Sequence, residues 1–191
     1  NRSENNAIIG SYISRSQIRY GVKKPNPFCN DPLNYVLETD LTEKYDFENI
    51  FVNGAADILN GATVENRYQT LLTNGTQTSG NIFNQKGFAE KKIQDIIRME
   101  IENYRLKFQG SIEGLITSWP TNYVLDGWIV RMKTGGAIQP HMHDRGWLSG
   151  SIYINVPPKL NKGSGNLVVC LDAHPAKNKD LKSIDLVTGS L

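Results

Sequence analysis

The chain contains 191 residues, of which 39% are hydrophobic and 21% are charged, and its formal net charge is +2. A chain of this length can bury one sizeable core, or one core with an extension. The near balance of charges argues against nucleic acid as the main partner, because phosphate binding usually produces a basic excess. No apolar run approaches the roughly 18 residues of a membrane span. We therefore expect neither a nucleic-acid partner nor a membrane partner.

Residues 1–30 are expected to form an N-terminal extension, or the tail of an upstream helical domain. Apolar residues between Ala7 and Tyr20 give a partial helical pattern, and prolines at positions 25 and 27 then favour extended structure. The polar N-terminus lacks both an initiating Met and a signal peptide. Cys29 and Cys170 match no metal or redox spacing, so we expect free thiols in a reducing, cytoplasmic compartment.

Two amphipathic segments predict helices. From Asp46 to Leu59 the apolar residues recur with a period of 3.6, and an Asn-Gly pair follows. The apolar stripe from Ala89 to Phe108 is clearer, and only Glu100 interrupts it. Such a stripe is typical of a helix that packs on a sheet. Between the two segments, the polar and glycine-containing stretch 73–81 predicts a loop.

After Gly110 the hydrophobic period changes from 3.6 to two, which predicts β-strands. The predicted strands are 122–133, 148–156, 166–171 and 184–187. Several strands separated by short turns indicate a β-sandwich or a barrel. We therefore expect an α+β or mainly β protein, in which helices of the N-terminal half pack on an antiparallel β core.

Two of the three histidines in the chain, His141 and His143, lie two residues apart, and Asp144 follows at once. On an extended segment, side chains at positions i and i+2 point to the same side. Two imidazoles placed in this way have ligand geometry for a transition metal. The alternative is a polar loop with two surface histidines.

The predicted strand 148–156 has a second face that is polar but uncharged. Its members are Ser149, Ser151, Tyr153 and Asn155. A solvent-exposed face usually carries Lys or Glu, so these residues suggest a lined cavity, and a mildly polar exposed strand is the alternative. Arg131, on the strand before the histidines, could bind a carboxylate bidentately or pair with an acidic side chain at the surface.

These motifs resemble the Fe(II)/2-oxoglutarate-dependent oxygenases. They are most similar to the branch with an H-x-H…S-G-x-x-Y…P signature, which is related to prolyl and aspartyl hydroxylases and is sometimes fused to tetratricopeptide repeats. The resemblance rests on Gly127–Met132, Gly136, Pro140–His143 and Gly146–Pro157, with Gln77–Phe83 as a further match. It implies that residues 31–191 form a double-stranded β-helix domain, a cupin-like jelly roll with helices packed on it.

The resemblance also implies a site. His141 would be the first Fe(II) ligand, and His143 takes the place of the family's usual carboxylate, with Asp144 as the fallback. The distal histidine and the basic residue that grips 2-oxoglutarate are expected beyond Leu191, which would leave the domain incomplete at its C-terminus. His174 is not expected to replace the distal ligand. Tyr153, Ser149 and Arg131 are the candidates for contacts with the cosubstrate.

The implied activity is that of a dioxygenase that uses Fe(II) as cofactor and 2-oxoglutarate as cosubstrate. It would hydroxylate a C–H bond of a peptide or protein side chain, or of a small metabolite. Two alternatives remain open. One is a non-catalytic binding or regulatory module on the same fold, and the other is a histidine-rich, cupin-like metalloenzyme that does not use 2-oxoglutarate.

Overall fold

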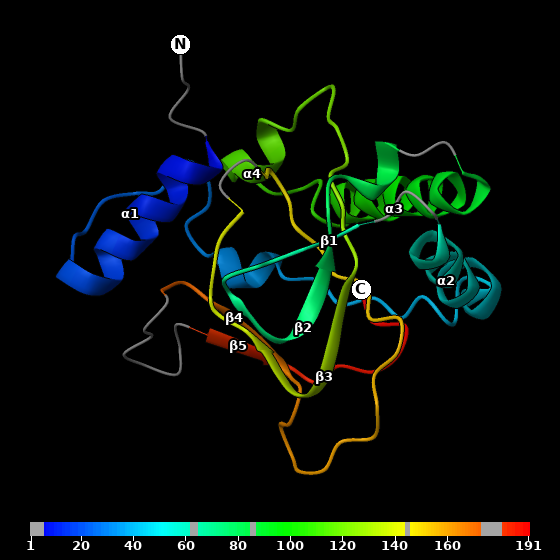
Figure 1. The fold of residues 1–191 in the computed structure, drawn as a ribbon. Coiled ribbons are helices and arrows are strands. Elements are labelled where there is room, and N and C mark those ends of the chain that lie inside the picture. The colour runs from blue at the N-terminus through cyan, green and yellow to red at the C-terminus, as the bar shows by residue number, and fades with distance from the viewer. Residues whose placement is uncertain (1–5, 62–64, 85–86, 144–145, 173–180) are drawn as a thin grey trace. The chain divides into compact units, whose positions relative to one another are not determined.

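The computed structural model describes residues 6–61, 65–84, 87–143, 146–172 and 181–191. The chain divides into two compact units. Figure 1 labels the helices and strands of the chain. Unit 1 comprises residues 1–40, 104–121 and 142–191, and unit 2 comprises residues 41–103 and 122–141. The helices are α1 (Ala7–Tyr20), α2 (Asn53–Asn60), α3 (Phe88–Lys107) and α4 (Gly114–Thr117). The strands are β1 (Asn66–Arg67), β2 (Leu72–Thr78), β3 (Val130–Ile138), β4 (Leu167–Cys170) and β5 (Leu181–Ile184).

The two long predicted helices are confirmed. The first is helical from Phe47 and passes through a π-helical stretch, Glu48–Val52, into α2. Its buried face and that of α3 supply most of the core of unit 2. The buried apolar residues on these faces are Phe47, Phe51, Ala55, Ile58, Ile93 and Ile96. Gly54 brings the two helices close together, because a Cβ at this position would lie only 3.3 Å from Cδ1 of Ile93.

Glu100, which interrupts the apolar stripe of α3, is buried, and three side chains donate hydrogen bonds to its carboxylate. Its carboxylate accepts hydrogen bonds from Lys44 Nζ at 3.0 Å, Tyr45 Oη at 2.7 Å and Asn103 Nδ2 at 3.2 Å. Burial alone would raise the pKa of the Glu100 carboxyl, but the hydrogen bonds from Tyr45 and Lys44 outweigh burial and lower it. The polar interruption of the stripe is therefore a structural ion pair within unit 2.

The sheet of unit 2 corrects the prediction of a loop at 73–81. Within the described residues it has the order β1-β2-β3 and is antiparallel throughout. The strand β2 was missed because its exposed residues are polar and because it contains a glycine, a residue type that is depleted in strands. Only its end, Gln77 and Thr78, is buried. Ladder partners on β1 and β3, rather than apolar periodicity, hold this segment extended.

Unit 1 is organised around a small apolar cluster. Its buried members are Cys29, Tyr104, Leu115 and Ile116, and several aromatic side chains pack around them. Both cysteines are free, as expected. Burial raises the pKa of the Cys29 thiol to about 12, and the nearby Glu113 carboxylate adds to the shift. Cys29 is therefore a packing residue rather than a reactive thiol.

Helix α1 is attached to the rest of unit 1 by polar contacts. Asn26 is 1% exposed, and its amide nitrogen donates to the Gly10 carbonyl at 2.8 Å and to Ser14 Oγ at 3.1 Å. Arg19, near the end of the helix, donates from Nη2 to Oδ1 of the buried Asp172 at 2.8 Å. These contacts connect the first residues of the chain to the segment that follows β4. The proposed boundary at residue 30 stays a prediction.

The prediction of a strand at 148–156 is wrong. This segment forms no ladder with another described strand, and its pairing is restricted to single residues. Tyr153 N donates to the Ser190 carbonyl at 2.9 Å, and Gly189 N donates to the Tyr153 carbonyl at 2.8 Å. An alternating sequence makes a strand only where a neighbouring backbone supplies hydrogen-bond partners. Here only two residues of the C-terminal segment supply them.

Of the other three predicted strands, two are shifted along the chain and one is confirmed. The strand predicted at 122–133 begins later, as β3, because residues 123–129 have no continuous ladder partner. Strands β4 and β5 pair with each other, in the register Leu167 opposite Ile184 and Cys170 opposite Leu181. This confirms the strand at 166–171 and moves the strand predicted at 184–187 three residues toward the N-terminus.

The described residues thus form a mixed helix and sheet protein with antiparallel strands, a three-stranded sheet and a two-stranded sheet. The double-stranded β-helix stays a prediction. Within the described part of the chain, no helix combines the length and the apolarity needed to cross a membrane.

Candidate metal and cosubstrate site

Arg131 lies on β3 of unit 2, opposite Thr76 of β2. The register shifts between Thr73 and Gly75, so the ladder bulges beside the arginine. A Cβ at Gly75 would lie 2.8 Å from the Arg131 carbonyl oxygen, so the close approach of the strands requires glycine. Asn74 takes a positive φ of 49° at the same bulge. The bulge therefore fixes the backbone from which the exposed Arg131 side chain projects.

The predicted surface ion pair of Arg131 is not present among the described residues, where no acidic side chain lies within ion-pair distance of it. Its guanidinium stays available to solvent, and to an anionic ligand. A planar guanidinium can hold a carboxylate through two parallel hydrogen bonds.

His141 follows the end of β3 in unit 2, and its backbone neighbour controls its tautomer. Gln139 N donates to the Leu71 carbonyl at 2.8 Å, which continues the sheet past Ile138. The Gln139 carbonyl oxygen in turn lies 2.8 Å from Nδ1 of His141. A carbonyl oxygen can only accept, so Nδ1 carries the proton and Nε2 carries the lone pair. This is the orientation that a metal-ligating histidine commonly adopts.

His143 belongs to unit 1 and is exposed. Its carbonyl oxygen accepts a hydrogen bond from Gly146 N at 3.1 Å, which makes a turn over the two residues between them. Asp144, the fallback ligand, is one of these two residues and lies outside the described part of the chain. The two histidines are thus held by separate local contacts, His141 by Gln139 and His143 by the turn.

Trp147 anchors the segment after this turn to the core of unit 1, a role that the sequence analysis missed. Its ring meets that of Phe28 edge to face, with centroids 5.1 Å apart. Its Nε1 donates to the Leu115 carbonyl oxygen at 3.1 Å. The available signal was a lone tryptophan beside a glycine in an otherwise polar stretch. The anchor restrains the backbone from which Ser149 and its neighbours follow.

The cosubstrate candidates Ser149 and Tyr153 lie in unit 1 in different environments. Ser149, Ser151 and Asn155 are exposed, whereas Tyr153 is half-buried. The common polar face predicted for them depended on a strand and is not present. Burial raises the pKa of the Tyr153 hydroxyl, and a hydrogen bond with Ser151 partly offsets this shift. The Tyr153 hydroxyl therefore keeps its proton at neutral pH and can donate a hydrogen bond.

The described side chains do not make up a metal site by themselves. Among the described residues there is no group of three or more His, Cys, Asp or Glu side chains that could hold a metal ion. His174 and Asp144, the other candidate ligands considered, both lie outside the described residues. The described residues provide two imidazoles in sequence proximity, and a firm Fe(II) site needs a further protein ligand.

Comparison with known proteins points to one family. Residues 126–183 match the model of the family described as "Putative 2OG-Fe(II) oxygenase". The match covers less than half of the chain and contains every candidate named above, from Arg131 to Tyr153. No curated protein and no solved structure matches the chain. The similarity of this segment supports an oxygenase of the Fe(II)/2-oxoglutarate class in general, without naming a substrate.

Proposed function

We propose that the protein is an Fe(II)- and 2-oxoglutarate-dependent dioxygenase. It hydroxylates a C–H bond of a peptide or protein side chain, or of a small metabolite. The observation that carries this proposal is the family similarity over residues 126–183, which includes the His141–His143 pair. The proposal is further supported by the hydrogen bond from His141 Nδ1 to the Gln139 carbonyl, which leaves Nε2 as the donor atom.

In this proposal His141 and His143 are the first two metal ligands. A third protein ligand is needed, because imidazole nitrogen donors alone bind Fe(II) only moderately. Asp144 is the fallback candidate for that ligand, and His174 is not expected to replace it. Bound iron would supply the oxidising chemistry. The reaction converts dioxygen, 2-oxoglutarate and the C–H bond into carbon dioxide, succinate and a C–OH group, with one oxygen atom entering each of the last two products.

The cosubstrate is assigned to three side chains. Arg131 offers a guanidinium for the distal carboxylate of 2-oxoglutarate, because no described acidic side chain competes for it. Tyr153 offers a protonated hydroxyl, and Ser149 an exposed one. The protein's part is to bind and orient the cosubstrate.

Anaerobic Fe(II) titration, followed by addition of 2-oxoglutarate, tests the proposal. We expect saturable 1:1 binding of Fe(II), and a new visible charge-transfer band when 2-oxoglutarate chelates the metal. His141→Ala and His143→Ala should each weaken Fe(II) binding at least about tenfold. Asp144→Asn and His174→Ala identify the third ligand, and the exposed Asp126→Asn is the control, which should bind Fe(II) as the wild type does.

The outcomes separate the proposal from its two alternatives. Fe(II) binding that depends on both histidines, without any spectral response to 2-oxoglutarate, would favour the cupin-like metalloenzyme. No Fe(II) binding above that of the His141→Ala variant would leave the non-catalytic binding module. Loss of the charge-transfer band in Arg131→Ala, with Fe(II) binding retained, would support the assignment of the carboxylate to Arg131.

A further inference from the structure

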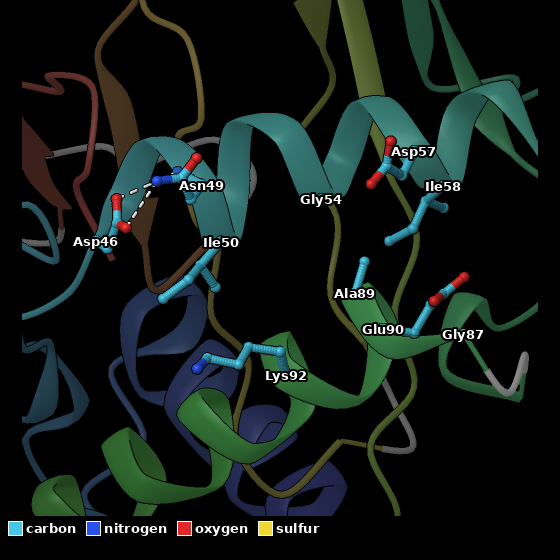
Figure 2. Close-up of a pocket in the computed structure, with 10 residues that line it drawn as sticks. All are labelled: Asp46, Asn49, Ile50, Gly54, Asp57, Ile58, Gly87, Ala89, Glu90 and Lys92. Carbon is cyan, nitrogen blue, oxygen red and sulfur yellow. Dashed lines mark hydrogen bonds between the residues drawn. The ribbon is translucent and has the colours of Figure 1, made fainter.

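The helices α2 and α3 of unit 2 border a cavity that has no part in the candidate metal and cosubstrate site (Figure 2). Its volume is about 640 Å³, within the range of roughly 300–1,000 Å³ that is typical of ligand sites. It is lined by Asp46, Asn49, Ile50, Gly54, Asp57, Ile58, Gly87, Ala89, Glu90 and Lys92. All of these residues belong to unit 2, so the cavity is defined within one compact unit.

The middle of the cavity is apolar. Ile50, Ile58 and Ala89 line it, and Gly54 lies beside Ala89 at the point where the two helices approach. Figure 2 shows Ile50 and Ile58 pointing from the upper helix toward the lower one, on either side of Gly54. This surface can cover the aliphatic part of a ligand.

The charges around the cavity are mostly negative. Three carboxylates, those of Asp46, Asp57 and Glu90, line it together with a single ammonium, that of Lys92. Asp46 is already used, since its Oδ2 accepts from Asn49 Nδ2 at 2.8 Å and its Oδ1 accepts from Asn49 N at 3.4 Å. Asp57 is exposed, and neither Asp57 nor Glu90 forms a hydrogen bond or ion pair with another described residue. An anionic ligand is therefore disfavoured and a cationic one is favoured.

Glu90 gives the second, independent sign of a ligand. The residue is only 7% exposed, yet its carboxylate has no partner among the described residues. The carboxylate lies against Gly87, where a Cβ would overlap its Oε2 atom. Glu90 lies in the first turn of α3, where the helix dipole favours an anion. This favourable interaction offsets part of the cost of partly removing the carboxylate from water. No described side chain neutralises this carboxylate, so an incoming cation would gain a charge-assisted contact with it.

A metal ion does not fit this arrangement. The described residues contain no group of three or more His, Cys, Asp or Glu side chains arranged to hold one. The carboxylates are instead separated by the apolar middle, with Asp46 near Ile50 and the pair Asp57 and Glu90 near Ile58 in Figure 2. A cation at the end of an aliphatic chain matches both parts of the cavity.

We propose that this cavity binds a lysine or arginine side chain of a partner polypeptide. The aliphatic stem packs on Ile50, Ile58 and Ala89, and the cationic head lies between Glu90 and Asp57. The site is independent of the dioxygenase proposal, because it requires neither iron nor 2-oxoglutarate and uses none of the residues assigned to them.

Fluorescence anisotropy with a labelled octapeptide that contains two adjacent arginines tests this proposal on the whole chain. The reference probe is the same peptide with glutamines in place of the arginines. We expect saturable binding of the arginine peptide only, and an approximately tenfold weaker affinity for the Glu90→Gln variant, because a charge-assisted contact is lost. Asp57→Asn, at an exposed position, should weaken binding by about threefold.

Two further variants separate a built site from general charge attraction. Gly87→Ala keeps every charge but displaces the Glu90 carboxylate, so it should weaken binding of the arginine peptide as Glu90→Gln does. Asp95→Asn removes an exposed negative charge from the same helix outside the cavity, and binding should stay within twofold of wild type. Equal losses in Asp95→Asn and Glu90→Gln, equal binding of the glutamine peptide, or the absence of saturable binding would overturn the proposal.

Discussion

The α3 helix and the segment around the two histidines hold their polar side chains in opposite ways. Glu100 of α3 is buried, and Lys44, Tyr45 and Asn103 donate hydrogen bonds to it. His141, His143 and Ser149 are exposed, and they follow one another on a segment that lacks a strand ladder. A buried carboxylate that accepts several hydrogen bonds contributes to stability, whereas side chains exposed on irregular backbone are accessible to a ligand.

This difference implies that stability and ligand binding depend on separate residues. Substitutions in the helical core of unit 2 should lower the free energy of unfolding and leave the proposed metal ligands, His141 and His143, intact in the remaining folded protein. Substitutions of His141 or His143 should instead weaken Fe(II) binding and leave the free energy of unfolding nearly unchanged. The four predictions below test this separation, from the largest expected effect on stability to the smallest.

The largest effect is expected for Phe51→Ala. Phe51 is 1% exposed, and its ring stacks on that of Phe47 with centroids 5.0 Å apart. Truncation leaves a cavity in the core of unit 2 and should lower the free energy of unfolding by about 3–5 kcal/mol. Urea denaturation followed by far-UV circular dichroism measures this change. A loss below about 1 kcal/mol would contradict the assignment of Phe51 to the core.

Glu100→Gln should be the next most destabilising, and its effect should depend on pH. The pKa of Glu100 is lower in the folded than in the unfolded chain, so its contribution to stability is present above pH about 4.5 and is lost as the pH falls below that value. At pH 7 we expect a loss of about 1.5–3 kcal/mol, the cost of weakening hydrogen bonds to a charged group. Asp95→Asn, on the exposed face of α3, is the control.

Denaturation at a series of pH values measures this dependence. The difference in unfolding free energy between wild type and Glu100→Gln should shrink as the pH falls from 7 to below about 4.5, because protonation of wild-type Glu100 removes the charge that its partners stabilise. A difference that stays constant over this range would mean that the ion pair with Lys44 contributes nothing to stability.

Trp147→Phe should have a smaller effect, on unit 1. The substitution removes the hydrogen bond from Nε1 to the Leu115 carbonyl oxygen and retains an aromatic ring against Phe28. We expect a loss of about 1 kcal/mol, which thermal unfolding can measure. Trp119→Phe is a matched control, because no described residue accepts a hydrogen bond from the Trp119 indole nitrogen. Equal losses for the two variants would exclude the anchoring hydrogen bond.

The smallest effect on stability is expected for His141→Ala. Its side chain is exposed, and its contact with the Gln139 carbonyl is local. The free energy of unfolding without metal should therefore change by no more than about 0.5 kcal/mol. The stabilisation that excess Fe(II) gives to the wild type should be lost in this variant. A large destabilisation of the metal-free variant would mean that His141 is a structural residue.

The sequence predicted the helices well because their signal is local. The apolar spacing from Asp46 to Leu59 and from Ala89 to Phe108 is a property of each segment alone, and both are helical. The strand β2 and the segment 148–156 were misassigned, because a strand depends on a partner elsewhere in the chain. Thr73 and Thr76 are polar yet pair with β3, whereas 148–156 alternates yet has only isolated pairing with the described C-terminal segment.

The candidate site was likewise predicted only where its signal is local to the sequence. The spacing of His141 and His143 identified them as candidate ligands, and the family similarity covers them. The sequence could not predict that the Gln139 carbonyl would set the tautomer of His141, or that Trp147 would anchor the following segment on Leu115. Such contacts depend on backbone atoms whose positions are set by the fold. The acidic cavity between α2 and α3 had no sequence signal, because its carboxylates come from positions that are ordinary on exposed helix faces.

The most direct test of the proposed activity is a product balance measured on the whole protein with Fe(II), 2-oxoglutarate and dioxygen. Uncoupled turnover does not require the unknown substrate, so succinate and carbon dioxide can be followed without it. The proposal predicts that succinate and carbon dioxide appear in equal amounts, consume dioxygen, and are absent from the His141→Ala and His143→Ala variants. Succinate formation that is unchanged in both variants, or no succinate from a wild-type protein that binds Fe(II), would contradict it.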